Sequence, residues 1–125
     1  MVNVSSYDLI SIGLAPEDPW PAAPNDCWDV TKWAAANASS LGADPKKGFI
    51  VGGTSAGGNL TDVVAHLARD EDLSPPITGL LELVPLLTDA PRMPEKYKDF
   101  YISREQNRQA PIIPEKTIHG FDGSY

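Results

Sequence analysis

A short apolar run near the middle of this chain leads directly into a glycine-rich turn. The run, residues 48–52, is bounded by glycines and has the length and composition of a buried parallel strand. The turn reads Gly-Thr-Ser-Ala-Gly over residues 53–57, and apolar residues then recur at helical spacing. Because glycine has no Cβ, the glycines on both sides of Ser55 let a strand and a helix approach each other closely. The sequence therefore predicts a central strand over residues 48–52, a sharp turn at Ser55 and a helix over residues 57–69.

The residues upstream of this strand predict a weak strand, a loop and a helix. β-forming residues are scattered over residues 2–12 and predict the weak strand, whereas residues 13–24 contain four prolines and predict the loop. Residues 25–41 carry an amphipathic pattern, and Asn25 or Asp26 can cap the N-terminus of the helix that this pattern predicts.

The residues downstream complete an alternating order of elements. A third strand is expected within residues 79–87, with Pro85 interrupting it, and the proline-rich remainder predicts irregular structure and short helices. An order of strand, helix, strand, helix and strand is typical of a parallel sheet covered by helices. We therefore expect an α/β chain, with a parallel sheet flanked by helices, in a single domain over residues 1–125.

The glycine-rich turn also carries a pattern with chemical meaning. G-x-S-x-G is typical of a nucleophile elbow, in which a serine stands at the apex of the turn with its Oγ projecting from the sheet. Ser55 is then the candidate nucleophile, and the backbone N–H of Ala56 is a candidate oxyanion donor at the helix N-terminus. The elbow around them consists of Gly53, Thr54 and Gly57. The alternative is a glycine-rich turn that binds phosphate, but neither G-x-G-x-x-G nor a Walker pattern is present.

Three separate segments carry further motifs. Residues 14–23 read L-A-P-E-D-P-W-P-A-A, residues 41–45 read L-G-A-D-P, and residues 53–60 read G-T-S-A-G-G-N-L. In this order they resemble the L-A-P-E-x-P-x-P-A-A, L-G-x-D-P and G-D-S-A-G-G-N-L motifs of the hormone-sensitive-lipase-like esterases, a family of α/β-hydrolases. The chain departs from the family at Thr54, which replaces an acidic residue, and over residues 1–13, which match poorly.

The resemblance implies a fold, an activity and a substrate class. It implies a partial α/β-hydrolase fold and a serine carboxylic-ester hydrolase that forms an acyl-enzyme on Ser55 with a small-molecule ester. It also implies parts of the site that this sequence lacks. The family's His-Gly-Gly-Gly oxyanion motif lies upstream of the Leu-Ala-Pro-Glu segment, and its triad acid and histidine lie after further strands. We therefore expect a truncated α/β-hydrolase domain.

The two histidines are not expected to act as the catalytic base. His66 lies on the same predicted helix as Ser55, roughly 16 Å away at 1.5 Å per residue, which is beyond hydrogen-bond reach. His119 is followed by Gly-Phe, as the catalytic histidine of the family often is, and Asp89 would complete a triad order of Ser55, Asp89 and His119. Too little chain separates Asp89 from His119 for the missing strands and helices, so His119 is expected to be an incidental helix residue.

Charge and cysteine content exclude several other classes. The formal net charge is −7, which argues against nucleic acid and anionic membrane surfaces as partners. The single cysteine, Cys27, cannot form an internal disulfide, and we expect it to be a buried structural thiol rather than a nucleophile. No apolar stretch approaches the roughly 20 residues of a membrane span, and no signal peptide is apparent, so a cytoplasmic protein is expected. We expect no metal site and no cofactor.

Two functional hypotheses are left open at this point. In the first, the chain is a serine carboxylic-ester hydrolase that acts through Ser55. In the second, it is a non-catalytic, truncated remnant that lacks the oxyanion motif and the triad acid and histidine.

Overall fold

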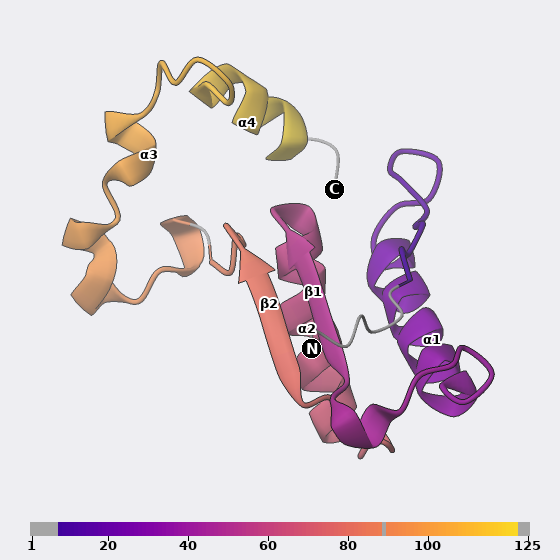
Figure 1. The fold of residues 1–125 in the computed structure, drawn as a ribbon. Coiled ribbons are helices and arrows are strands. Elements are labelled where there is room, and N and C mark those ends of the chain that lie inside the picture. Colours follow the sequence, from indigo (N-terminus) through magenta and orange to yellow (C-terminus); the bar gives the residue numbers. More distant parts are fainter. Residues whose placement is uncertain (1–7, 89, 123–125) are drawn as a thin grey trace. The chain divides into compact units, whose positions relative to one another are not determined.

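The computed structural model describes residues 8–88 and 90–122, and the chain forms two compact units that divide after Leu86. The first unit alternates helices and strands in chain order (Figure 1). Its elements are α1 (Ala22–Asn37), the short 3-10 helix η1 (Pro45–Lys47), β1 (Ile50–Thr54), α2 (Ala56–Asp70) and β2 (Gly79–Leu83).

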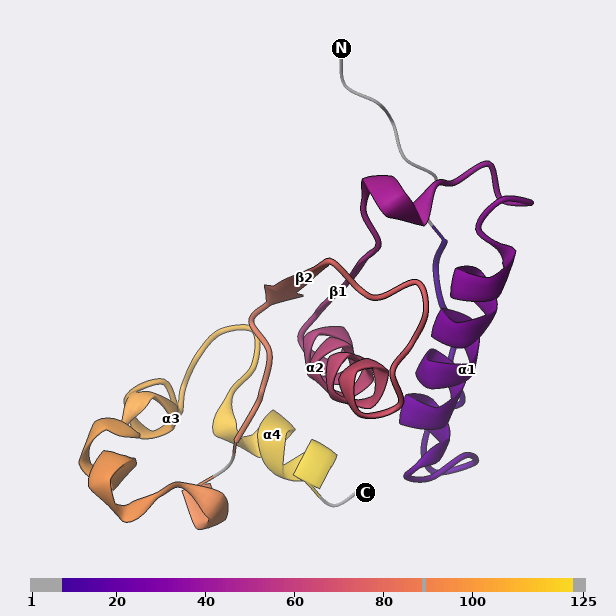
Figure 2. The ribbon, with the colours of Figure 1, turned by 90° about the horizontal axis from the view of Figure 1, so that it is seen from below.

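The two strands form a parallel sheet that is covered by helices, as the sequence predicts. Ile50 lies opposite Gly79 at one end of the sheet, and Thr54 lies opposite Leu83 at the other. Helix α2 connects the strands and packs against both of them, and α1 packs against α2. Figure 2 shows α2 lying between the strands and α1. The carboxyl ends of β1 and β2 therefore meet at one edge of the sheet.

The buried core of this unit lies between α1 and α2. Its members are Cys27 and Trp28 from α1 and Val64 and Ala68 from α2, and further apolar residues pack around them: Ile12, Leu60, Leu67, Leu73 and Ile77. The prediction of a buried thiol is confirmed, because Cys27 is only 7% exposed. Burial, together with the nearby charge of Asp26, raises the pKa of the Cys27 thiol.

Helix α1 begins earlier than its sequence pattern indicates. It starts at Ala22 instead of residue 25, and Pro24 is accommodated in its first turn, where a backbone N–H has no helical partner. The prediction that Asn25 or Asp26 caps the helix is wrong. The carboxylate Oδ2 of Asp26 instead accepts a hydrogen bond of 2.8 Å from the backbone N–H of Gly13, which ties the preceding loop to the helix.

The strands also differ from their predicted bounds. β1 runs from Ile50 to Thr54, two residues later than expected, because its pairing with β2 continues through the glycines up to the elbow. β2 ends at Leu83, and Val84 then adopts a left-handed φ of 47° that takes the chain out of the sheet. The weak strand predicted over residues 2–12 is absent from its described part, residues 8–12; residues 2–7 lie outside the described residues.

The second unit consists of short helices, as the proline-rich sequence predicts. They are η2 (Ala90–Arg92), η3 (Glu95–Phe100), α3 (Ser103–Gln106) and α4 (Glu115–Asp122). The side chain of Arg108 links α3 to α4, since it pairs with Glu105 at 3.1 Å and with Glu115 at 3.3 Å. Within residues 8–88 and 90–122, no helix has both the length and the apolar composition to cross a bilayer.

Candidate active site

Ser55 stands between β1 and α2 in a strained backbone conformation. Its φ of 57° and ψ of −116° lie outside the regions that residues with a side chain normally occupy. β1 ends one residue before it and α2 begins one residue after it. Ser55 is itself exposed. This is the strand–turn–helix geometry that a nucleophile elbow requires, with the serine at the apex of the turn.

The close approach of strand and helix at the elbow depends on Gly53. A Cβ built on Gly53 would lie 2.3 Å from the backbone carbonyl carbon and oxygen of Gly57, closer than real Cβ contacts occur. A Cβ on Gly57 would instead meet nothing within 4 Å, so the steric need predicted for this residue is not found. The second tight position is Gly58, where a Cβ would lie 3.1 Å from Pro85 Cβ and 3.3 Å from the carbonyl oxygen of Gly53.

Backbone hydrogen bonds hold the apex on both sides. The N–H of Ser55 donates to the carbonyl oxygen of Leu83 at 2.8 Å, which extends the pairing between the strands by one bond beyond the end of β1. The carbonyl oxygen of Ser55 accepts from the N–H of Asn59 at 3.1 Å and thereby begins the hydrogen-bond ladder of α2. The N–H of Ala56, the first residue of α2, precedes that ladder and lies at the positive end of the helix dipole.

Of the two histidines, only His66 has a described side chain. His66 lies in α2, with 61% of its side chain exposed and its Nε2 atom 3.8 Å from Asp62 Oδ1 one turn earlier, as expected of a helix-surface histidine. The backbone of His119 lies in α4, within the second unit, and its side chain is outside what the structure describes. Asp89 also lies outside the described residues. No group of His, Cys, Asp and Glu residues within the described part of the chain could hold a metal ion.

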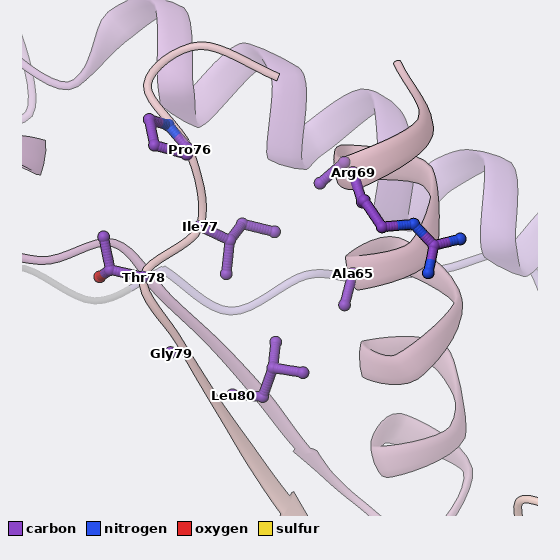
Figure 3. A pocket seen from close by; sticks show the side chains of 8 residues that line it. Ala65, Arg69, Pro76, Ile77, Thr78, Gly79 and Leu80 are labelled. Carbon is purple, nitrogen blue, oxygen red and sulfur yellow. The ribbon is translucent and has the colours of Figure 1, made fainter. Parts of the chain in front are cut away.

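Figure 3 shows a cavity whose lining does not include Ser55. It has a volume of about 330 Å³ and is lined by the last turns of α2 and the residues that lead into β2, among them Ala65, Arg69, Ile77 and Leu80. Because the strands are parallel, the start of β2 and the elbow after β1 lie at opposite edges of the sheet. The Arg69 guanidinium at this cavity is already hydrogen-bonded to Asp70 at 2.7 Å.

A strand–elbow–helix unit on a parallel sheet is the arrangement of the α/β-hydrolase fold. Residues 9–125 match a family model described as alpha/beta hydrolase fold. Vibralactone cyclase, a solved structure that is 42% identical, superposes with a TM-score of 0.85 over 91% of this chain and 34% of its own.

Two relatives extend the match to the family. An AB hydrolase superfamily protein of Schizosaccharomyces pombe is 43% identical over 90% of this chain and 33% of its own length. Versiconal hemiacetal acetate esterase of Dothistroma septosporum is 37% identical over 86% of this chain and 33% of its own length. The chain thus belongs to the hormone-sensitive-lipase-like family of α/β-hydrolases, in which matched members are named carboxylesterase and esterase, and it spans about a third of the length of the relatives it matches.

The contacts that follow β2 were not apparent in the sequence. Pro85 packs against Gly58, and the Asn59 side chain donates from Nδ2 to the carbonyl oxygen of Leu86 at 2.9 Å. The doubled glycine at 57–58 was a signal for a second close approach. No local pattern signals the pairing of Asn59 with a backbone carbonyl 27 residues away.

Proposed function

We propose that this chain is the nucleophile-bearing part of a serine carboxylic-ester hydrolase, in a single truncated α/β-hydrolase domain. The observation that carries the proposal is the backbone of Ser55, whose φ of 57° and ψ of −116° are costly for a residue with a side chain. Strain of this kind is concentrated at functional sites, and it exposes a serine hydroxyl at the start of a helix. Family membership supports an ester as the substrate.

The proposed chemistry proceeds in two steps through Ser55. The hydroxyl oxygen attacks the ester carbonyl carbon while its proton passes to a general base, and the carbonyl becomes a tetrahedral oxyanion that the Ala56 N–H stabilises. The tetrahedral intermediate then collapses, the alcohol leaves with a proton, and an acyl group stays on Ser55. Water hydrolyses this acyl-enzyme to release the acid and restore the serine hydroxyl. Gly53 permits the close approach of strand and helix at this turn, and Thr54 ends β1.

A second candidate function is that of a non-catalytic remnant. The chain spans about a third of the length of its relatives, and the side chain of His66 lies 3.8 Å from Asp62 on the exposed side of α2. A serine without a base is a weak nucleophile, and a single oxyanion donor is less than a complete oxyanion hole; loss of one donor alone lowers the rate by roughly 10²–10³. We therefore expect weak hydrolysis at most from this chain alone.

Hydrolysis of a short-chain p-nitrophenyl ester by the purified chain tests the proposal, with Ser55→Ala and His119→Ala as variants. The proposal predicts a small rate above buffer that is lost in Ser55→Ala and kept in His119→Ala. Robust turnover that both variants abolish would instead make His119 the base. Turnover equal to buffer in all three proteins would favour the remnant, and turnover that survives Ser55→Ala would refute Ser55 as the nucleophile.

A further inference from the structure

The segment that leaves β2 contacts the elbow and the first turn of α2 at three points. We call residues 83–86 the exit turn. Its first residue, Leu83, accepts the hydrogen bond from the Ser55 N–H at 2.8 Å, and its third, Pro85, packs against Gly58. Its last, Leu86, accepts the hydrogen bond from the Asn59 side chain at 2.9 Å. All three contacts reach the elbow or the first turn of α2 from the same short segment.

The exit turn is itself strained, so it does not hold this shape by its own preference. Val84 has a φ of 47°, and a β-branched residue in the left-handed region is a clear outlier because its side chain crowds the backbone. Such a conformation persists only where the surroundings over-determine it. Val84 is also 78% exposed, so burial of its own side chain contributes little. The neighbours, Leu83 and residues 85–86, must therefore supply the restraint.

Among the three contacts, only the one from Asn59 depends on a polar side chain. The bond from Ser55 to Leu83 joins two backbone groups, and the contact at Gly58 requires only that no side chain be present. Asn59 is different, because its amide donor crosses from α2 to the far end of the exit turn. Asparagine is otherwise a poor residue inside a helix, where its side chain competes for backbone partners.

We propose that Asn59 is a positioning residue for Ser55. Its hydrogen bond to Leu86 closes the exit turn over α2, and the closed turn keeps the Leu83 carbonyl under the Ser55 N–H, so that the serine stays in its strained conformation. The proposal deepens the function proposed above, and only its catalytic consequence rests on that function. The structural link from Asn59 through Leu86 to Ser55 stands independently of any turnover.

Asn59→Asp tests the link, because aspartate keeps the size of the side chain and replaces the donor by a second acceptor facing the Leu86 carbonyl. Asn37→Asp is the matched control: Asn37 is also a helix residue whose Nδ2 donates to a backbone carbonyl, that of Trp33 at 2.8 Å, but it lies on α1. Hydrogen exchange of the Ser55 amide, measured by NMR on the whole chain, reports the bond to Leu83, and the Val64 amide reports the rest of α2.

Asn59→Asp is expected to raise the exchange rate of the Ser55 amide about tenfold, the equivalent of one hydrogen bond, and to leave Val64 within about twofold. Asn37→Asp is expected to change neither rate. An unchanged rate at Ser55, or an equal rise at Ser55 and Val64, would overturn the proposal. If Asn59→Asp does not fold, Asn59→Ala removes the donor without adding an acceptor, and the same rates decide.

Hydrolysis of a p-nitrophenyl ester tests the catalytic effect of Asn59, which rests on the proposed hydrolase function. Hydrogen exchange tests the structural link by itself. A displaced nucleophile lowers kcat and leaves KM unchanged, so Asn59→Asp is expected to lower kcat about tenfold. A raised KM with the wild-type kcat would count against positioning. An inactive wild-type chain would refute the proposed function for this chain, whereas the exchange rate of Ser55 would still decide the role of Asn59.

Discussion

Replacing Gly53 by alanine should disrupt the elbow more than any other single methyl group added to it. The new Cβ would lie 2.3 Å from both the carbonyl carbon and the carbonyl oxygen of Gly57 and 2.8 Å from its Cα. Ordinary contact begins at 3.4 Å, so the methyl group falls more than an ångström short of the space it needs. Every atom that it meets belongs to the backbone of the first turn of α2, and no flexible side chain can move aside.

The loss of stability in Gly53→Ala depends on how far the first turn of α2 must move away from β1. Overpacking of a rigid site costs about 1–3 kcal/mol and sometimes more. Moving the first turn of α2 away from β1 also disturbs the hydrogen bond from Ser55 to Leu83, which contributes about 1 kcal/mol. We expect Gly53→Ala to lower the free energy of unfolding by about 3 kcal/mol or more, roughly a hundredfold in the folding equilibrium.

Gly57→Ala is the matched control, since it adds the same methyl group to the same turn. A Cβ there meets nothing within 4 Å, and alanine in place of glycine stabilises a helix by roughly 0.5–1 kcal/mol. Urea unfolding of both variants, followed by circular dichroism in a stabilising osmolyte, measures the two free energies. Equal stabilities of Gly53→Ala and Gly57→Ala would refute the account of how strand and helix meet at Ser55.

Three further outcomes are expected. Ser55→Gly should be about 1 kcal/mol more stable than Ser55→Ala in urea unfolding, because glycine adopts the φ of 57° without steric strain, and equal stabilities would argue against strain. The raised pKa of the Cys27 thiol stabilises the folded chain below the unfolded thiol pKa of about 8.5, and this stabilisation is lost as the pH rises through the folded pKa. Cys27→Ala should remove this loss of stability at alkaline pH, as measured by unfolding curves at a series of pH values. The chain alone should melt at low temperature, since Ile50, Leu81 and Val84 are 67%, 58% and 78% exposed, and a cooperative melt of the monomer at high temperature would contradict this.

β1, the elbow and α2 were predictable because the sequence signals for them are local. The apolar run before the elbow, the glycines around Ser55 and the amphipathic helix after it lie within some twenty residues, and the structure places β1 and α2 within two residues of their expected bounds. Each of these signals concerns a residue and its immediate neighbours. Tertiary contacts had little scope to override them.

The errors lie where distant residues compete with local preference. Aspartate is a common helix cap, but the carboxylate of Asp26 accepts a hydrogen bond from the N–H of Gly13, thirteen residues earlier. Helix α1 begins at Ala22, before Asp26. Val84 has strong β-propensity, yet β2 stops before it because the chain turns over the elbow. The hydrogen bond from the Asn59 side chain to Leu86 joins residues 27 positions apart, and no sequence periodicity predicts such a contact.

The candidate site was predictable only in part. Ser55, Ala56 and Gly53 follow from the spacing of one motif, and the structure places all three at the elbow. The steric roles of Gly57 and Gly58 could not be told apart from the sequence, because they depend on which glycine faces Pro85. Whether Ser55 is a nucleophile stays a prediction that only its reactivity can test.

Covalent labelling of the whole chain by an alkyl fluorophosphonate tests whether Ser55 is a nucleophile. The Ser55 oxygen would displace fluoride from phosphorus, its proton would pass to solvent, and the adduct would be located by mass spectrometry of the resulting peptides. Ser40, an exposed serine on the turn after α1, provides an internal reference. We expect slow labelling at Ser55 that exceeds labelling at Ser40 at least tenfold and disappears in urea, because the elbow and the Ala56 N–H would stabilise the developing charge. Equal labelling of Ser55 and Ser40 in the folded chain would contradict it.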